Sequence, residues 1–554
     1  MDDDRSRGLV VQRRQLLALD VDGRLRAIRE AARPAELVRS LPAQEFYLTL
    51  VGAGVDDGGF LLALASRHQL EFVLDVGAWG PEGLEPARLA RWFAAMQQSD
   101  PTLVARWLAT GDETTVVLAL SRLLRVYKLD ESTESTFWPP DRQVPTIDGL
   151  YYFEVRDEET EDVLPVMLEA LTRLRAENRQ AYEGLLEQVL WVVPAEQEEE
   201  AYQLRASRLA EKGFPALDEA IDVWAAAPEA SRKARAALAQ RLHARAAGGP
   251  APGAAPDVTL PVALGPPGNA LARAAAALSD EQRERLVHDL VRVGNRFAVA
   301  SLGHLGDPET HRDGLLFAVS HVNLAVAELS RDAPEVGPLA LTELPVYELS
   351  RAGTGAVLER AWRAQRLRSG WLSRVAHADA RLDEPLSAIL EGLLLARPLF
   401  TGGGERRPFR APEDLAAADA ALDALEDLGE FLEQRLGAGP VDLPELQTPV
   451  AAREGPGDME WSAVALTALA QQALGGEPRP VPLAPDAARR ALAELRRPGV
   501  LRRAAADLGL ARAEWLLASR LAEDTAEIGE DAPDPRFVRA LLLRWGEATG
   551  PGTP

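Results

Sequence analysis

Histidine and aspartate side chains gather in one stretch of the chain, and these residue types could hold a metal ion. The members of this group are His288, His304, His311 and His321, with Asp289, Asp307 and Asp313 beside them. Imidazole nitrogens and carboxylate oxygens are common ligands of divalent metals. The stretch 288–321 is therefore the first place to look for metal chemistry.

The spacing of these residues argues against a shared metal. Asp307 and Pro308 read as the N-cap and first position of a helix, which separates His304 from His311 and His321. The last two histidines differ by about 1000° of helical rotation, so they point to different faces. We expect no bound metal and no cofactor, and histidines that are solvated or that cap helices. A metal-dependent enzyme or a regulator that responds to divalent cations through this region is the alternative.

Other reactive constellations are missing from the sequence. The chain has no cysteine, which excludes disulfides, thiolate metal sites and cysteine nucleophiles. Lysine occurs only at Lys128, Lys212 and Lys233, and none stands in a phosphate-binding loop motif. The run LVGAGVDDGG imitates a dinucleotide-binding turn, but Asp56 and Asp57 would face the pyrophosphate. The sequence thus favours a protein that is not an enzyme.

Charge and hydropathy limit the possible partners. The 554 residues include 85 acidic and 61 basic side chains, which gives a formal charge of −24. Such a charge repels phosphate backbones, so we expect no nucleic-acid partner. No apolar run approaches the roughly 18 residues of a membrane span, and we expect no membrane insertion. We predict a cytoplasmic protein.

The clearest local signal is a helix, its end and the start of a second helix within residues 194–224. Pro194 suits a first helical turn, and acidic residues follow it at the positive end of the helix dipole. Gly213 is expected to end the helix in a left-handed conformation, and Pro215 cannot continue it. Asp218 and Glu219 then supply the acidic first turn of the next helix.

The same kind of reading along the chain predicts a mostly α protein built as a multi-unit helical array. Residues 150–155 (LYYFEV) are expected to form one isolated extended segment, because no partner strand is evident. The expected parts are a short-helix superhelical domain over 9–130, a central helical module over 131–245, a Pro/Gly linker over 246–268, a helical domain over 269–437 and C-terminal helices over 458–549.

Five residues are candidates for contacts with a partner. Phe137 and Trp138 belong to an aromatic and proline-rich run, FWPPD, of a kind that more often marks docking than catalysis. Tyr202, Arg205 and Arg208 lie close together on the helix that begins at Pro194. An arginine pair beside a tyrosine could hold a phosphate or a partner's carboxylate, although pairing between helices is the commoner use. We expect a non-enzymatic protein that acts as a protein-binding, scaffold or regulatory protein. Its partner is expected to be a protein, and the sequence does not reveal its oligomeric state.

Three runs together carry a family resemblance: LPAQEFYLTL, TIDGLYYFEV and EEEAYQLRASRLAEKGFPALDEAIDVW. The chain resembles, over about residues 9–395, an uncharacterised bacterial family catalogued as a domain of unknown function. That resemblance implies no activity, cofactor or catalytic residue. Residues 35–127 are also similar to the cytoplasmic helical repeat domain of a magnesium-transporter family, which implies a right-handed stack of short helices.

Overall fold

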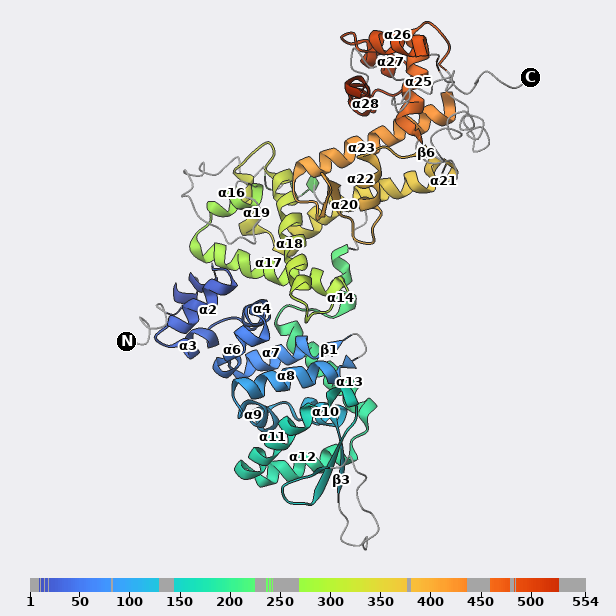
Figure 1. Ribbon diagram of the computed structural model, residues 1–554. Helices are drawn as coiled ribbons and strands as arrows, with labels where there is room; N and C mark the ends of the chain where they lie inside the picture. Colours follow the sequence, from blue (N-terminus) through green and yellow to red (C-terminus); the bar gives the residue numbers. More distant parts are fainter. Residues whose placement is uncertain are drawn as a thin grey trace, which may run out of the picture. The chain divides into compact units, whose positions relative to one another are not determined.

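The structure is a computed structural model, and it is mostly α-helical, as the sequence predicts (Figure 1). The residues it describes fall into two compact units. Among the described residues, unit 1 comprises those up to Val223 together with Ser279–Val319, and unit 2 comprises the others. The described residues are 9, 11–13, 15–17, 19–80, 83–128, 144–224, 236–237, 239–240, 242, 269–375, 380–435, 459–478, 483 and 485–527.

Unit 1 is an array of mostly short helices. Side-chain caps set several of the helix starts: Ser66 and Gln69 form a capping box, Asp112 accepts from the backbone of Thr115, and Asn178 accepts from that of Ala181. The helices are α2 (Val21–Glu30), α3 (Pro34–Arg39), α4 (Ala43–Ala53), α5 (Val55–Gly58), α6 (Phe60–Leu64), α7 (Arg67–Gly77), α8 (Pro86–Ser99), α9 (Leu103–Thr110), α10 (Glu113–Leu123), α11 (Val163–Glu177), α12 (Arg179–Trp191), α13 (Pro194–Glu211), α14 (Leu217–Ile221), α17 (Asp280–Ala300) and the part of α18 (Pro308–Leu329) up to residue 319.

The end of α13 confirms the prediction made at Gly213. This glycine has a φ of 89°, and its N–H donates to the carbonyl of Ala210 at 3.0 Å. The N–H of Phe214 donates to the carbonyl of Leu209 at 2.9 Å. These two bonds satisfy carbonyl groups that the last turn of a helix otherwise leaves open. The following α14 begins with Asp218 and Glu219 in its first turn, as expected.

The extended segment near residues 150–155 is a strand, but the prediction that it is isolated is wrong. Strand β5 (Tyr151–Val155) lies between β3 (Leu124–Lys128) and β4 (Val144–Pro145) in an antiparallel sheet. Val126 pairs with Phe153, whose side chain is fully buried. The partner β3 follows the apolar α10 without a break, so its residues read in sequence as more of that helix. A second pair, β1 (Trp79–Gly80) and β2 (Gly83–Leu84), follows α7.

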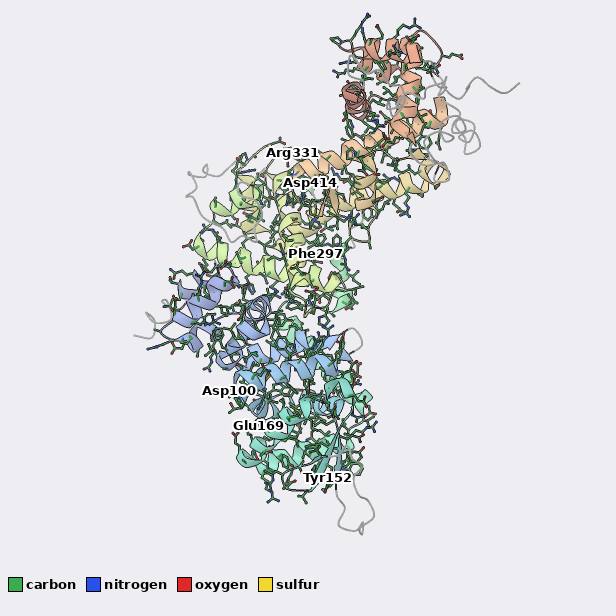
Figure 2. The ribbon with its side chains drawn as sticks, viewed as in Figure 1. Asp100, Tyr152, Glu169, Phe297, Arg331 and Asp414 are labelled. Atoms are coloured by element: carbon green, nitrogen blue, oxygen red, sulfur yellow. The ribbon has the colours of Figure 1, made fainter. Side chains whose placement is uncertain are left out.

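Residues on both sides of the predicted linker contribute to unit 1, because α17 and the start of α18 belong to it. Phe297 of α17, labelled in Figure 2, stacks on Phe317 of α18 with ring centroids 5.6 Å apart. The linker itself, 246–268, lies outside the described residues. The division into five parts and the superhelical stacking of the short helices stay predictions.

Unit 2 packs its helices around a core of leucine, alanine and the buried Trp461. Its short strands are β6 (Ala380–Arg381), parallel to β9 (Met459–Glu460), and β7 (Phe400–Gly402), antiparallel to β8 (Glu405–Arg407). Its helices are α16 (Ala270–Ala276), the rest of α18, α19 (Val336–Glu343), α20 (Val346–Ser369), α21 (Trp371–Val375), α22 (Leu386–Leu393), α23 (Pro412–Glu430), α25 (Trp461–Ala473), α26 (Pro485–Leu495), α27 (Val500–Asp507) and α28 (Glu514–Glu527).

Within the described part of the chain, no helix combines the length and the apolar composition that crossing a membrane would require.

Candidate functional site

Arg208, one of the predicted contact residues, is bound within unit 1. Its Nε donates to Oδ2 of Asp75 at 2.9 Å and its Nη2 donates to Oδ1 at 2.6 Å. Asp75 lies on α7 and is only 3% exposed. Burial raises the pKa of the Asp75 carboxyl, and the hydrogen bonds from Arg208 act in the opposite direction. This bidentate ion pair connects α13 to α7. Arg208 is therefore used for pairing between helices, the commoner use of such an arginine.

A small cavity of about 20 Å³ adjoins the Asp75–Arg208 pair. Its other lining residues are Glu71, Leu74, Trp107, Asp112 and Thr115. A space of this size holds about one water molecule, so it is no substrate pocket.

Arg205, one helical turn before Arg208, is held differently. Its Nε donates to the backbone carbonyl of Asp75 at 2.6 Å, and its guanidinium carbon lies 5.2 Å from the ring centroid of Trp79. No other group in the described part of the chain accepts a hydrogen bond from Arg205. Burial lowers its pKa, because removal from water disfavours the charged form. Arg205 thus has an aromatic face and a backbone contact, but no carboxylate of its own.

Tyr202 completes the predicted group on α13. Its side chain is 45% exposed, and its ring centroid lies 6.4 Å from that of Trp79. The structure therefore brings Tyr202 and Arg205 together around Trp79, while Arg208 is directed to Asp75. Phe137 and Trp138 lie outside the described residues. The role of all five residues as contacts for a partner stays a prediction.

His304 contacts the backbone of Trp79. The N–H of Gly306 donates to its Nδ1 at 2.9 Å, so the proton is on Nε2, which donates to the carbonyl of Trp79 at 2.6 Å. Nη1 of Arg88 lies 2.9 Å from Nδ1, and Arg88 also forms an ion pair with Glu85. Burial and then the charge of Arg88 lower the pKa of His304. His304 is accordingly a neutral group that positions the β1 backbone.

The turn that carries His304 contains a strained residue. Leu302 follows the C-cap of α17 and has a φ of 53°, in the left-handed region that glycine favours. Its side chain is 71% exposed. A bulky apolar residue thus occupies a position where the backbone conformation favours glycine and the exposure to solvent favours a polar residue.

His311 belongs to a separate buried network in unit 1. Its Nε2 donates to the carbonyl of Leu305 at 2.5 Å, so its Nδ1 accepts from Nε2 of Gln44 at 3.1 Å. Gln44 and Asn295 also exchange hydrogen bonds of 2.8 and 3.0 Å between their side-chain amides. Burial lowers the pKa of His311. The network connects α4, α17 and α18 with satisfied polar groups, which is a structural role.

His321 belongs to unit 2 and contacts Thr354 of α20, with 2.9 Å between Nδ1 and Oγ1. It is fully buried, and burial lowers its pKa to about 3. His288 is exposed on α17. The four histidines thus have different surroundings. Among the residues that the structure describes, no group of three or more His, Asp or Glu side chains could hold a metal ion.

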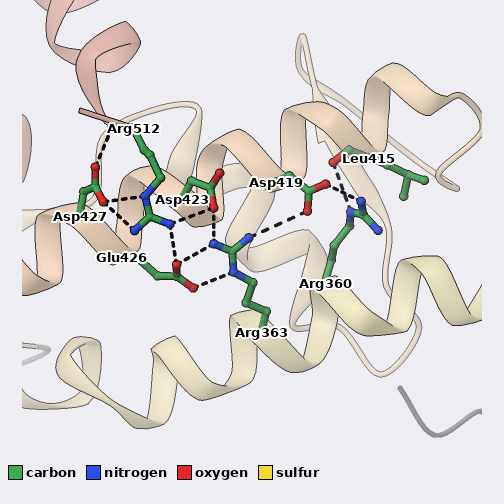
Figure 3. Close-up of polar contacts among 8 residues, drawn as sticks. All are labelled: Arg360, Arg363, Leu415, Asp419, Asp423, Glu426, Asp427 and Arg512. Carbon is green, nitrogen blue, oxygen red and sulfur yellow. Dashed lines mark hydrogen bonds and ion pairs between the residues drawn. The ribbon is translucent and has the colours of Figure 1, made fainter. Parts of the chain in front are cut away.

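A second charged cluster lies in unit 2, between α20, α23 and the turn before α28 (Figure 3). Arg363 holds Glu426 through two hydrogen bonds of 2.7 Å. Arg512 donates from its backbone N–H and from its Nε to Asp427, at 2.7 and 2.8 Å, and also contacts Glu426 at 3.0 Å. Arg363 and Arg512 thus share a carboxylate, so the cluster joins three segments of unit 2.

Sequence reasoning missed Asp75 and Trp79, around which the predicted arginines are arranged. A signal for Asp75 was present, because it is a charged residue within the apolar run FVLDVG of α7. A charge in such a run needs a buried partner. The sequence does not identify that partner, since Arg208 lies 133 residues away.

Comparisons with known proteins bear on the family and on nothing finer. No curated protein and no solved structure matches the chain. The similarity of residues 35–127 to a magnesium-transporter domain is therefore not shown. The model of a family of unknown function, DUF6178, matches residues 4–544. This match covers nearly the whole chain, which therefore belongs to the DUF6178 family.

Proposed function

We propose that this chain is a non-enzymatic protein-binding or scaffold protein of the cytoplasm, and that unit 1 carries its binding surface. The observation that carries the proposal is Leu302, which combines a φ of 53° with a side chain that is 71% exposed. A left-handed conformation costs a non-glycine residue roughly 1–2 kcal/mol. Strain of this kind is commonly kept where a residue serves a function.

The surroundings of Leu302 support the same proposal. His304, two residues later, is hydrogen-bonded to Trp79, and the Trp79 ring contacts the exposed Tyr202. Tyrosine and arginine side chains held by a rigid support are typical of protein interfaces. The formal charge of −24 favours a protein partner over a nucleic acid.

The alternative, a metal-dependent enzyme or a cation-responsive regulator built on residues 288–321, has no contact in its favour. His304 and His311 each use both ring nitrogens in hydrogen bonds within unit 1. A neutral imidazole can bind a metal ion through its unprotonated nitrogen, but in His304 and His311 that nitrogen already accepts a hydrogen bond.

Affinity capture from the native host, quantified by mass spectrometry, tests the proposal. Leu302→Gly removes the apolar side chain and relieves the strain, so we expect a more stable protein that captures its partner about 10-fold less. Leu302→Ala should lose the partner equally without the gain in stability. The matched control is Leu395→Ala, which removes a partly exposed leucine from unit 2 and should leave capture unchanged.

If Leu302→Gly melts at a higher temperature and still captures every protein that the wild type captures, the strained turn is not part of a binding surface. The proposal in its present form would then be wrong.

A further inference from the structure

Arg205 differs from the other arginines near Trp79 because, among the described residues, it forms no ion pair at hydrogen-bonding distance, although the Asp75 carboxylate attracts its charge. Arg208 pairs with Asp75, Arg88 pairs with Glu85, and Arg122 of α10 pairs with Glu198 of α13. His304 is neutral, as its hydrogen bonds and lowered pKa indicate. In the part of the chain that the structure describes, Arg205 has no carboxylate partner.

Arg205 also keeps part of its hydrogen-bonding capacity. A guanidinium group carries five N–H donors, and the described contacts of Arg205 use Nε alone. The guanidinium carbon lies over the ring of Trp79, and the two terminal nitrogens make no hydrogen bond to a described residue, so we call the edge that they form the binding edge. That edge matches the two oxygens of a carboxylate in a bidentate arrangement.

We infer that Arg205 binds a carboxylate presented by a partner protein, with the neighbouring ring of Tyr202 available to contact the carbon chain that carries it. This inference rests on the proposed protein-binding function and names the chemistry of its partner. The Asp75 carboxylate is hydrogen-bonded to Arg208 and attracts Arg205 only from a distance, so one further negative charge on the terminal nitrogens of Arg205 can be accommodated. A phosphate dianion would add an unmatched negative charge to a chain that already carries −24.

The position of Arg205 makes such a contact specific. Its Nε bond to Asp75 and its place on Trp79 fix the orientation of the guanidinium before any ligand binds. A group that is already oriented loses less conformational freedom on binding. Arg208 cannot bind the partner's carboxylate in its place, because Nε and Nη2 of Arg208 already donate hydrogen bonds to the two carboxylate oxygens of Asp75.

Residue-specific arginine modification tests the inference on the full chain, without a variant. The protein is treated with phenylglyoxal in sodium chloride, sodium acetate or sodium phosphate at equal ionic strength, and modification is mapped by mass spectrometry. We expect acetate to slow the modification of Arg205 at least about 3-fold relative to chloride, and more than phosphate does. Arg179 is the internal control, since it lies on the surface of unit 1 and pairs with Glu183. Its rate should not change.

Three results overturn the inference. They are equal rates at Arg205 in acetate and chloride, stronger protection by phosphate than by acetate, and an Arg205 that does not react in any of the salts. None of these results depends on a partner protein. Each would therefore contradict the carboxylate contact without contradicting the proposed protein binding, which the Leu302 variants test separately.

A second arm uses a partner captured by the wild-type chain. Its affinity for Arg205→Gln should be at least about 10-fold weaker, whereas Arg179→Gln should bind within about 2-fold of the wild type. A partner that binds Arg205→Gln as tightly as the wild type contradicts the carboxylate contact and leaves protein binding itself in place.

Discussion

Asp75 and Arg208 form a bidentate ion pair although 133 residues separate them in the chain. The same Asp75 binds Arg205 through its backbone carbonyl alone. Two arginines one turn apart on α13 therefore differ in what they can do. Arg208 is neutralised and fastens two helices, whereas Arg205 is oriented but keeps its charge and its terminal donors. This difference, and not the arginine pair as such, makes the α13 surface a candidate for recognition.

Replacing Gly213 should cost more stability than removing one acidic residue from the start of the same helix. Gly213→Val places a β-branched residue at a φ of 89°, with its Cβ 3.1 Å from the Arg292 side chain. We expect a loss of more than ~1 kcal/mol in the free energy of unfolding. Glu199→Ala removes one of several acidic residues near the start of α13 and should cost less than ~1 kcal/mol. Equal shifts in thermal melting of the two variants would contradict the role of Gly213 as a helix terminator.

The contrast between Gly213 and β3 shows what the sequence could and could not reveal. The end of α13 depends on residues 209–215 alone, so local rules of helix termination suffice. Strand β3 depends on pairing with β5, and its residues continue directly from α10. Such non-local pairing leaves no local signal. Arg205 and Arg208 were found because they are polar neighbours on one helix, but their different partners come from α7 and β1.

Acid should weaken unit 2 through His321. Its pKa is lowered from 6.5 to about 3 by burial. The unfolded chain therefore binds a proton below pH 6.5 while the folded chain does not, so the stability contributed by the neutral imidazole is full above that pH and falls as the pH drops towards 3. We expect a loss of about 2 kcal/mol between pH 7.5 and pH 5.

The variant His321→Asn can still donate to Thr354 and does not titrate, so its urea midpoint should change less over the same pH range. His68→Gln is the control variant, because it replaces an exposed histidine of unit 1. A His321→Asn protein with the wild-type pH dependence would show that His321 is not the group responsible.

Arg363 should contribute more to stability than a surface arginine. It makes two hydrogen bonds to Glu426 and one to Asp423, and these carboxylates raise its pKa. Arg363→Met leaves both carboxylates beside each other, so we expect a loss of about 1–3 kcal/mol from unit 2. The control Arg497→Met breaks an exposed pair with Glu494 and should cost under ~0.5 kcal/mol.

The difference between the stability losses of these two variants should narrow in 1 M sodium chloride, because salt screens the repulsion between Asp423 and Glu426, which Arg512 alone then offsets. Urea unfolding of both variants at low and high salt measures this difference in the free energy of unfolding. A difference that is the same at both salt concentrations would mean that Arg363 acts through the packing of its carbon chain and not through its charge.

Cleavage of the chain within residues 246–268 should not separate the products. This segment has many prolines and glycines, and a protease with little sequence preference is the appropriate probe because arginine and lysine are absent from it. Unit 1 contains α4 from before the segment and α17 and the first part of α18 from after it. The Gln44–Asn295 amide pair and the contact of Gln44 with His311 join these helices.

We therefore expect the two fragments to co-elute in size-exclusion chromatography under native conditions and to separate in urea. Asn295→Leu removes the amide partner of Gln44, which keeps only its contact with His311, and leaves the carbonyl of Lys212 without the hydrogen bond from Asn295. This change should weaken the association of the cleaved fragments. Fragments that separate in native buffer, each with its own sharp melting transition, would instead support a domain boundary at the linker, as the sequence alone predicts.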